Sequence, residues 1–281
     1  MKEIHVDRIV ETVRDLCIRS CYDLPEDVLA ALEDAIAIEE SNVGKELLAQ
    51  LVENARMAAR ERMPICQDTG VTIVFVEMGQ DVRIVGGSFA DAVNEGIRKG
   101  YVEGYLRKSV VDDPIFARKN SGDNTPGFIY TDIVPGDRLK ITVMPKGTGS
   151  ENMGGIRMLV PADGADGIRK FVVETVDKAQ SNPCPPIIVG VGVGGMMEHA
   201  PLIAKKALLR KVGAPHPNPE IAALERRILE DINDLGIGPQ GLGGRVTALA
   251  VHIETAPTHI GAMPVAVTIQ CHAARHAEAV L

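Results

Sequence analysis

Residues 64–76 read PICQDTGVTIVFV, and the periodicity of the chain changes within this stretch. Before Pro64, apolar residues from Ile4 to Leu16 recur at helical spacing. From Val71 onward, β-branched residues follow one another as they do in a strand. The change predicts an α+β (mixed) fold, in which an N-terminal helical region packs on β-sheet segments that carry the functional loops.

The rest of the chain alternates between both types of element. The turn residues Pro135-Gly136-Asp137 separate two strand-like runs and predict a hairpin-like pair. We find no internal repeat and no low-complexity linker, so we expect one domain over residues 1–281, with a helical subregion 1–62 and an α/β subregion 63–281. Other expected helices cover residues 91–105, 166–180, 200–209 and 219–235, and other expected strands cover residues 187–190, 247–251 and 265–269.

Composition limits the class of protein. The 281 residues carry a formal net charge of −8, with 24% charged and 45% hydrophobic residues, which is typical of a globular protein and argues against a nucleic-acid partner. We find no signal-like start and no apolar stretch of membrane-spanning length, so we expect a cytoplasmic location and no membrane partner. The five cysteines are then expected to be reduced.

Three of the cysteines stand alone beside loop-forming residues: Cys66, Cys184 and Cys271. Three loop thiolates that meet in the fold could hold a metal cluster. Since a fully ligated [4Fe–4S] cluster takes four thiolates, a set of three would leave one iron open. Cys17 and Cys21 are four residues apart on an expected helix, and we interpret them as packing thiols.

Several neighbouring residues carry useful chemistry, and each also has a structural interpretation. Gln67 and Asp68 follow the first cysteine and could bind substrate or move a proton, but an Asp in such a turn also caps its own backbone. Arg107 could bind a carboxylate, or it could be a solvated charge at the end of a helix. His259, in a loop before the Cys271 segment, could be an acid/base or a structural histidine.

Two glycine-rich segments are also candidates. Residues 146–152 (KGTGSEN) could bring backbone amides close to an anion, or form a surface turn. Residues 190–195 (GVGVGG) follow a strand and resemble part of a dinucleotide-binding loop, but two expected helices follow without a second strand. We interpret this second segment as a tight backbone bend that brings Cys184 toward the centre.

Taken together, these segments resemble the α subunit, or N-terminal half, of the class I iron–sulfur fumarase and L-tartrate dehydratase family. The resemblance rests on residues 64–70, 107–109, 123–126, 146–152, 182–195 and 256–271, in one order. It implies a [4Fe–4S] cluster held by Cys66, Cys184 and Cys271. It further implies substrate binding by Gln67, Arg107 and a loop glycine, for which we expect Gly149, and active-site roles for Asp68 and His259.

The resemblance also implies an activity and partners. We expect a hydro-lyase subunit that hydrates fumarate to L-malate, a reaction of the tricarboxylic acid cycle, with L-tartrate dehydration as the alternative. Single-chain members have a further C-terminal domain, so we expect a separate β subunit to complete the site, and a self-dimer of this chain. Two readings of other classes are an electron-transfer or sensor iron–sulfur protein and, at residues 190–195, a nicotinamide dinucleotide-binding protein.

Overall fold

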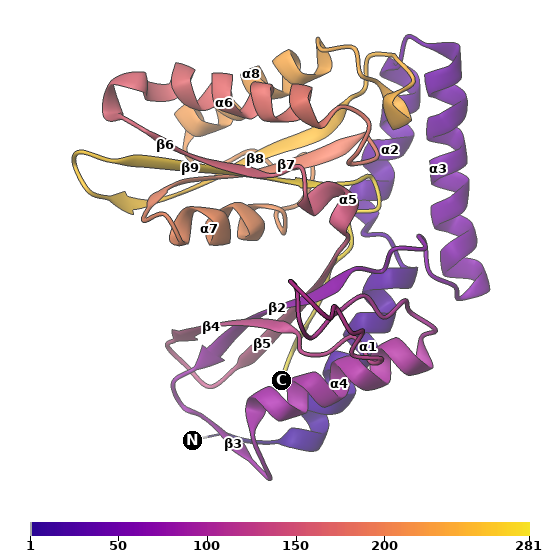
Figure 1. Cartoon of the computed structure of the whole chain (residues 1–281), viewed down its shortest axis with the longest axis vertical. Coiled ribbons are helices and arrows are strands. Elements are labelled where there is room, and N and C mark those ends of the chain that lie inside the picture. Colours follow the sequence, from indigo (N-terminus) through magenta and orange to yellow (C-terminus); the bar gives the residue numbers. More distant parts are fainter. Residues whose placement is uncertain (1) are drawn as a thin grey trace. The chain divides into compact units, whose positions relative to one another are not determined.

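The computed structural model describes residues 2–281, which group into two compact units. The first unit holds the described residues up to Pro25, with Ala55–Gly147 and Arg275–Leu281; the second holds Glu26–Asn54 and Thr148–Ala274. Each unit combines helices with a four-stranded sheet, and the first also contains a two-stranded one (Figure 1). The α+β class predicted from the sequence is therefore confirmed.

The first unit is a sheet with two helices packed on one face (Figure 1). The order of its main sheet is β10-β5-β2-β4, and β1 pairs with β3 in a small parallel sheet. Its elements are β1 (Lys2–His5), α1 (Val6–Tyr22), β2 (Val71–Gly79), β3 (Val82–Val85), α4 (Phe89–Glu103), β4 (Phe128–Val134), β5 (Leu139–Lys146) and β10 (Ala277–Val280).

Two details of this unit differ from the sequence predictions. Ile4 pairs with Ile84 in the small sheet, so the first helix begins only at Val6. The strands β4 and β5 do not form the predicted hairpin, because β2 lies between them, parallel to β4 and antiparallel to β5. The turn at residues 135–137 thus links two strands that are not neighbours, a long-range pairing that turn chemistry cannot reveal.

Cys17 and Cys21 lie in the core between α1, α4 and the sheet, where both are fully buried. Burial raises the pKa of the Cys17 thiol well above its ordinary value and that of Cys21 to about 11. A Cβ on Gly100 of α4 would lie 2.7 Å from the Cβ of Cys17, so the two helices are in close contact there. The interpretation of these cysteines as packing thiols is confirmed.

The second unit is a three-layered arrangement around the sheet β6-β9-β7-β8 (Figure 1). The helices α6 and α8 cover one face, and α7 packs on the other through Ala200 and Ala204. Its elements are α2 (Glu26–Ile38), α5 (Thr148–Glu151), β6 (Gly155–Leu159), α6 (Gly164–Ala179), β7 (Ile187–Gly195), α7 (His199–Ala207), α8 (Pro219–Asn233), β8 (Ala248–Thr258), β9 (Met263–Gln270) and 3₁₀ turns at Pro161–Asp163 and Pro239–Gly241; α3 (Asn42–Glu61) spans the unit boundary.

Residues 190–195 are the last six residues of β7 and do not form the predicted bend. Their glycines serve helix–sheet packing: a Cβ on Gly190 would lie 2.2 Å from the carbonyl oxygen of Ala204, and one on Gly192 would lie 2.1 Å from that of Ala200. Only residues without a Cβ allow α7 to come this close to the strand. The segment is therefore part of a strand on which α7 packs, and it is not a loop between a strand and a helix that could bind a phosphate.

Glu39 ties the corner between α2 and α3 to the start of β8. Its side chain is buried, and its carboxylate accepts 2.8 Å hydrogen bonds from four backbone N–H groups: those of Glu40, Ser41, Arg245 and Val246. Burial alone would raise the pKa of this carboxyl group, but the N–H groups outweigh burial and hold the pKa below its ordinary value. The folded structure therefore needs Glu39 in its ionised form.

We expect Glu39→Gln to lower the free energy of unfolding at pH 7 by about 2 kcal/mol, because the uncharged amide satisfies the buried N–H groups poorly. Since the folded state depresses this pKa, the contribution is present above about pH 4.3 and is lost as the pH falls through the depressed value. Urea unfolding of both proteins at pH 7 and at acid pH measures this. Equal stability at pH 7 contradicts the prediction, and Glu46→Gln on the exposed surface of α3 is the control.

We expect Gly192→Ala to destabilise the second unit by about 2–3 kcal/mol, because the new methyl group forces α7 away from β7. Gly155→Ala is the matched control in the same sheet, since its Cβ would lie 3.6 Å from the nearest atom, in the ring of Phe171, an ordinary contact. Thermal and urea unfolding compare the two variants. If both are equally stable, the close contact of β7 with α7 does not constrain position 192.

Candidate functional site

Two of the predicted cluster cysteines meet at one end of the strands β7 and β9 in the second unit. The strands β7 and β9 are antiparallel, and Ile188 near the start of β7 pairs with Gln270 at the end of β9. Cys184 precedes β7, and Cys271 directly follows β9. The register therefore brings together two thiols that are far apart in the sequence.

The Cys184 loop is held in an unusual conformation. Cys184 has a φ of +56°, a region that residues other than glycine adopt at an energetic cost and that recurs at active sites. Its carbonyl oxygen lies 3.4 Å from the backbone N of His272 and 3.1 Å from the Nδ1 of that residue. Gln240 braces the loop by donating from its backbone N and its Nε2 to the carbonyl oxygen of Pro185, at 2.8 and 2.7 Å.

Gly149 lies in the short helix α5, beside this same loop. A Cβ on Gly149 would lie 3.2 Å from the carbonyl oxygen of Asn182, two residues before Cys184. The second unit thus places three of the predicted site residues, Gly149, Cys184 and Cys271, around one end of its sheet.

The other predicted residues near a cysteine lie in the first unit, in the loop before β2. The Sγ of Cys66 lies 3.3 Å from the Oε1 of Gln67, whose side chain is exposed. Asp68 accepts a 3.0 Å hydrogen bond from the backbone N of Gly70, so its carboxylate does cap its own turn. The backbone carbonyl of Asp68 also accepts a 2.8 Å hydrogen bond from the guanidinium of the buried Arg275.

Arg107 is positioned next to this loop through its backbone. The hydroxyl of Thr69 accepts a 2.9 Å hydrogen bond from the backbone N of Arg107 and lies 3.2 Å from its carbonyl oxygen. The helix α4 ends at Glu103, so Arg107 lies in the following loop and not at the helix end. The side chain of Arg107 is exposed. Its backbone is fixed to Thr69, which lies three residues after Cys66 in the sequence.

Asn124 closes the same arrangement from the far end of the long loop after α4. Its side chain is fully buried; the Oδ1 accepts from the backbone N of Ser109 at 2.7 Å, and the Nδ2 donates to the carbonyl oxygen of Gly70 at 3.2 Å. Asn124 has a φ of +64°, a conformation that asparagine tolerates better than most residues. The first unit thus gathers Cys66, Gln67, Asp68 and Arg107 into one loop cluster.

His259 lies away from the cysteines of its own unit. It sits in the exposed turn between β8 and β9, and Gly195 at the end of β7 pairs with Thr258 beside it. Cys271 follows the other end of β9, so closeness in the sequence does not place the two side chains together. The eight residues of β9 separate them by about 26 Å at 3.3 Å per residue.

Several residues that support the site were not singled out from the sequence: Thr69, Arg275, Gln240 and His272. A buried threonine or a buried arginine has no local pattern that marks it. His272 directly follows Cys271, and this adjacency was the one signal available for it.

The three predicted ligand cysteines are at least partly accessible to solvent, in contrast to the buried Cys17 and Cys21. Among residues 2–281, no three His, Cys, Asp or Glu side chains are gathered as a ready-made metal site. The three cysteines are divided between the units, with Cys66 in the first and the other two in the second.

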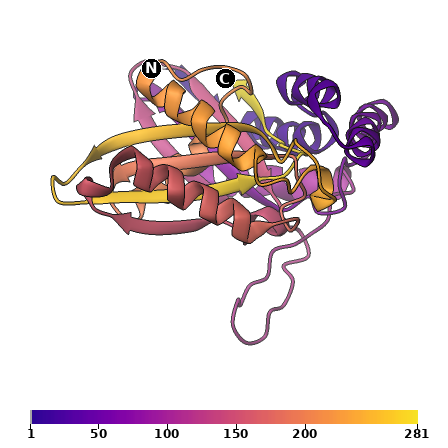
Figure 2. The same cartoon turned by 90° about the horizontal axis from the view of Figure 1, so that it is seen from above.

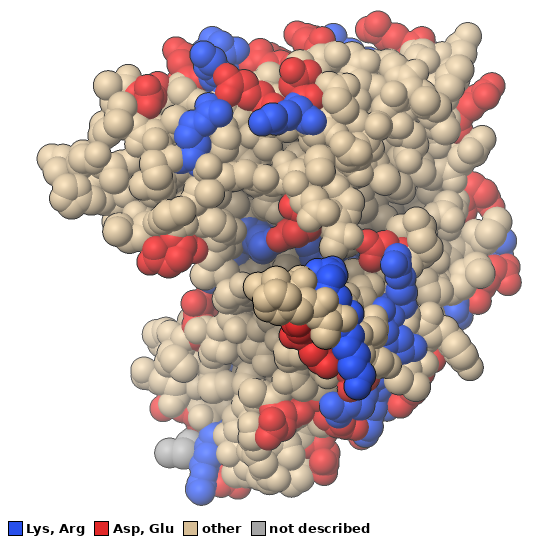
Figure 3. Space-filling view, viewed as in Figure 1, with Lys and Arg blue, Asp and Glu red and all other residues tan. Residues whose placement is uncertain are grey.

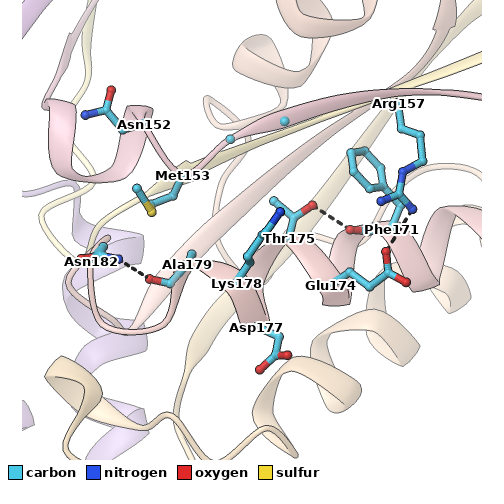
Figure 4. Close-up of a pocket in the computed structure, with 12 residues that line it drawn as sticks. Asn152, Met153, Arg157, Phe171, Glu174, Thr175, Asp177, Lys178, Ala179 and Asn182 are labelled. Carbon is cyan, nitrogen blue, oxygen red and sulfur yellow. Dashed lines mark hydrogen bonds and ion pairs between the residues drawn. The ribbon is translucent and has the colours of Figure 1, made fainter.

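A separate cavity of about 730 Å³ opens beside α6 and β6 of the second unit (Figure 4). Within it the guanidinium of Arg157 lies 4.4 Å from the ring centre of Phe171 and 3.0 Å from the carboxylate of Glu174. Asn182 reaches the cavity wall, but none of the eight predicted site residues lines it.

No helix in residues 2–281 has the length and apolar character needed to cross a membrane.

Comparison with known proteins now adds the family. Residues 10–280 match the sequence model of the family described as fumarate hydratase (fumerase). A protein of Methanocaldococcus jannaschii, provisionally named L(+)-tartrate dehydratase subunit alpha, is 45% identical over 279 residues, which cover 96% of this chain and 95% of the relative. The L(+)-tartrate dehydratase subunit alpha of Escherichia coli K12 is 35% identical over 277 residues, 98% of this chain and 91% of the relative. The chain belongs to the fumarate hydratase family, together with the α subunits of L(+)-tartrate dehydratases.

Proposed function

We propose that this chain is the α-type subunit of a hydro-lyase that reversibly hydrates fumarate to L-malate. The observation that carries the proposal is the family match over residues 10–280. The names of the relatives favour a second candidate, the dehydration of L(+)-tartrate. Both reactions add or remove water next to a carboxylate of a four-carbon diacid, so they require the same kinds of residue.

We propose that Cys66, Cys184 and Cys271 hold a [4Fe–4S] cluster. The donor set fits such a group, because all three thiols lie on loops and are at least partly accessible, and the strained backbone of Cys184 is of the kind found at functional sites. When bound, the cluster would supply an open iron that acts as a Lewis acid toward the hydroxyl and a carboxylate of the substrate.

The side chains of the first unit suit the binding of a diacid. The exposed guanidinium of Arg107 can bind a carboxylate through two parallel hydrogen bonds, while its fixed backbone limits where the carboxylate lies. Gln67 can donate from its amide beside the Cys66 thiol. In the second unit, Gly149 lets the backbone of α5 approach a ligand closely, because it has no Cβ.

Asp68 and His259 are the proposed proton-transferring groups. In the dehydration direction, a base must remove a proton from the carbon next to a carboxylate, which an aspartate or an imidazole can do. The Oδ1 of Asp68 is turned toward the Gly70 amide, which fixes the direction of the carboxylate.

The position of His259 bears on the partners. Since the length of β9 separates His259 from the cysteines at the other end of its own sheet, we propose that it acts at the cluster of a second copy of the chain. This geometry supports the self-dimer that the resemblance implies.

A β subunit is proposed as the further partner, because the relatives are named alpha subunits. The proposed location is the cytoplasm, and the proposed place of the reaction is the tricarboxylic acid cycle.

We expect anaerobically purified protein to contain about four irons per chain, and we expect Cys66→Ser, Cys184→Ser and Cys271→Ser each to lose most of it. Iron and sulfide analysis, with the visible absorption spectrum, measures this. Cys17→Ala is the control, because Cys17 is buried in the helical core and should not affect iron content. An active wild-type enzyme without iron would refute the proposed cofactor.

We expect the chain with its β subunit to hydrate fumarate, and the chain alone to turn over at least about a hundredfold more slowly, since the proposed β subunit would supply part of the groups that orient the substrate. Parallel assays with fumarate, L(+)-tartrate and mesaconate decide between the two candidate substrates. High activity of the isolated chain with its cluster would contradict the need for a partner. If substrate does not perturb the spectrum of the cluster, the electron-transfer or sensor alternative is favoured.

A further inference from the structure

The long loop after α4 forms a projecting arm in the first unit (Figure 2). We define the arm as residues 108–121. Its two sides pair like a short ribbon: Val111 bridges Asn120, the N of Asp112 donates to the carbonyl of Lys119, and the N of Ser121 donates to the carbonyl of Val110. The arm is therefore an ordered projection with a defined tip.

Two large apolar side chains stand next to each other at this tip. Ile115 is 72% exposed and Phe116 is 86% exposed. Because the chain has only five phenylalanines and no tryptophan, an aromatic ring placed in solvent at the end of an arm stands out. Aromatic side chains of this kind contribute strongly to protein–protein interfaces when they enter a pocket.

The tip is held in shape by its own polar groups. The carboxylate of Asp113 accepts hydrogen bonds from the backbone N–H groups of Ile115, Phe116 and Ala117, and these bonds hold the pKa of Asp113 below its ordinary value. Arg118 donates from its guanidinium to the carbonyl oxygen of Pro114 at 2.6 Å. A partner that takes up the tip therefore does not have to order it, which favours binding.

The base of the arm is continuous with the candidate site of the first unit. Arg107 directly precedes the arm and is fixed to Thr69, and Asn124 follows it and is fixed to Gly70. A protein that completes the site near Arg107 would lie within reach of the arm.

The charged residues of the arm indicate what kind of surface a partner would need. The arm carries Lys108, Arg118 and Lys119, while one of its two acids, Asp113, is turned toward backbone amides. The chain as a whole is acidic, with a formal charge of −8, and on the face that Figure 3 shows, basic and acidic side chains are interspersed. A surface that receives the arm should combine an apolar pocket with an acidic rim.

We propose that the arm is a docking element for the β subunit, with Ile115 and Phe116 inserted into an apolar pocket that has an acidic rim. This inference rests on the proposed function, which supplies the partner. The β subunit is chosen over a second copy because it is the partner that completes the substrate site, and the arm emerges from the segment that holds Arg107.

The test measures binding of purified β subunit to this chain by calorimetry or sedimentation, independently of enzyme activity. We expect Phe116→Ser and Ile115→Ser each to weaken the binding by about tenfold or more, the loss that truncating an interface anchor causes. Asp113→Ala should also weaken binding, because it frees the tip, without a loss of thermal stability in the core. Ile38→Ser is the matched control, since Ile38 is 63% exposed at the end of α2, in the second unit.

Unchanged affinity of Phe116→Ser for the β subunit overturns the inference. The inference is also overturned if Phe116→Ser dissociates a self-dimer of the isolated chain and leaves binding of the β subunit intact, because the occupant is then a second copy. If the enzyme proves to act on neither fumarate nor tartrate, yet Phe116→Ser still weakens the heteromer, the proposed activity fails while the docking inference stands.

Discussion

The antiparallel pairing of β7 with β9 is the constraint on which the candidate site of the second unit depends. In this register, the start of β7 lies next to the end of β9, so Cys184 and Cys271 meet there. The turn with His259 lies at the opposite end of these strands, next to the end of β7. One register thus decides which predicted residues can act together within a chain and which would need a second copy. The glycines of β7 contribute by letting α7 pack directly on the strand, which keeps this sheet covered on both faces.

In the first unit, buried polar side chains do the corresponding work. Thr69 fixes the backbone of Arg107, Asn124 fixes Gly70 and Ser109, and Arg275 holds the carbonyl of Asp68. These groups bond to backbone and leave the exposed side chains of Gln67 and Arg107 outside this set of bonds. A buried polar group without its partner is costly, so such bonds specify the loop conformation more strongly than apolar contacts do. The loop is thereby rigid where it is covered and open where a ligand would bind.

The sequence predicted most elements of the fold, because their signals are local. Helical spacing located α1, the predicted helical subregion 1–62 also contains α2 and α3, and strand-like runs located β2 and β9. The errors arose where an element depends on a distant partner. The turn at residues 135–137 suggested a hairpin, but β2 enters between the two strands. Residues 190–195 suggested a bend, because glycines are common in bends. Their actual reason, the close packing of α7 on β7, depends on a helix that the local sequence pattern does not show. The grouping of residues 26–54 with residues 148–274 is not visible in a local pattern either, and the prediction of one domain over residues 1–281 stays a prediction.

The same distinction applies to the candidate site. Cysteines beside loop formers could be proposed as ligands one by one, because a cysteine flanked by turn-forming residues is visible in the local sequence. The residues that hold them, such as Gln240 at the Cys184 loop, have none. His259 shows the opposite case: it is close to Cys271 in the sequence, but a strand of eight residues lies between them. A strand separates its two ends by its full length, so proximity along the chain indicates proximity in space only where the chain turns back. His259 lies in the turn between β8 and β9, before β9 begins, whereas Cys271 follows the other end of β9. The proposed role of His259 at the cluster therefore requires a second copy of the chain.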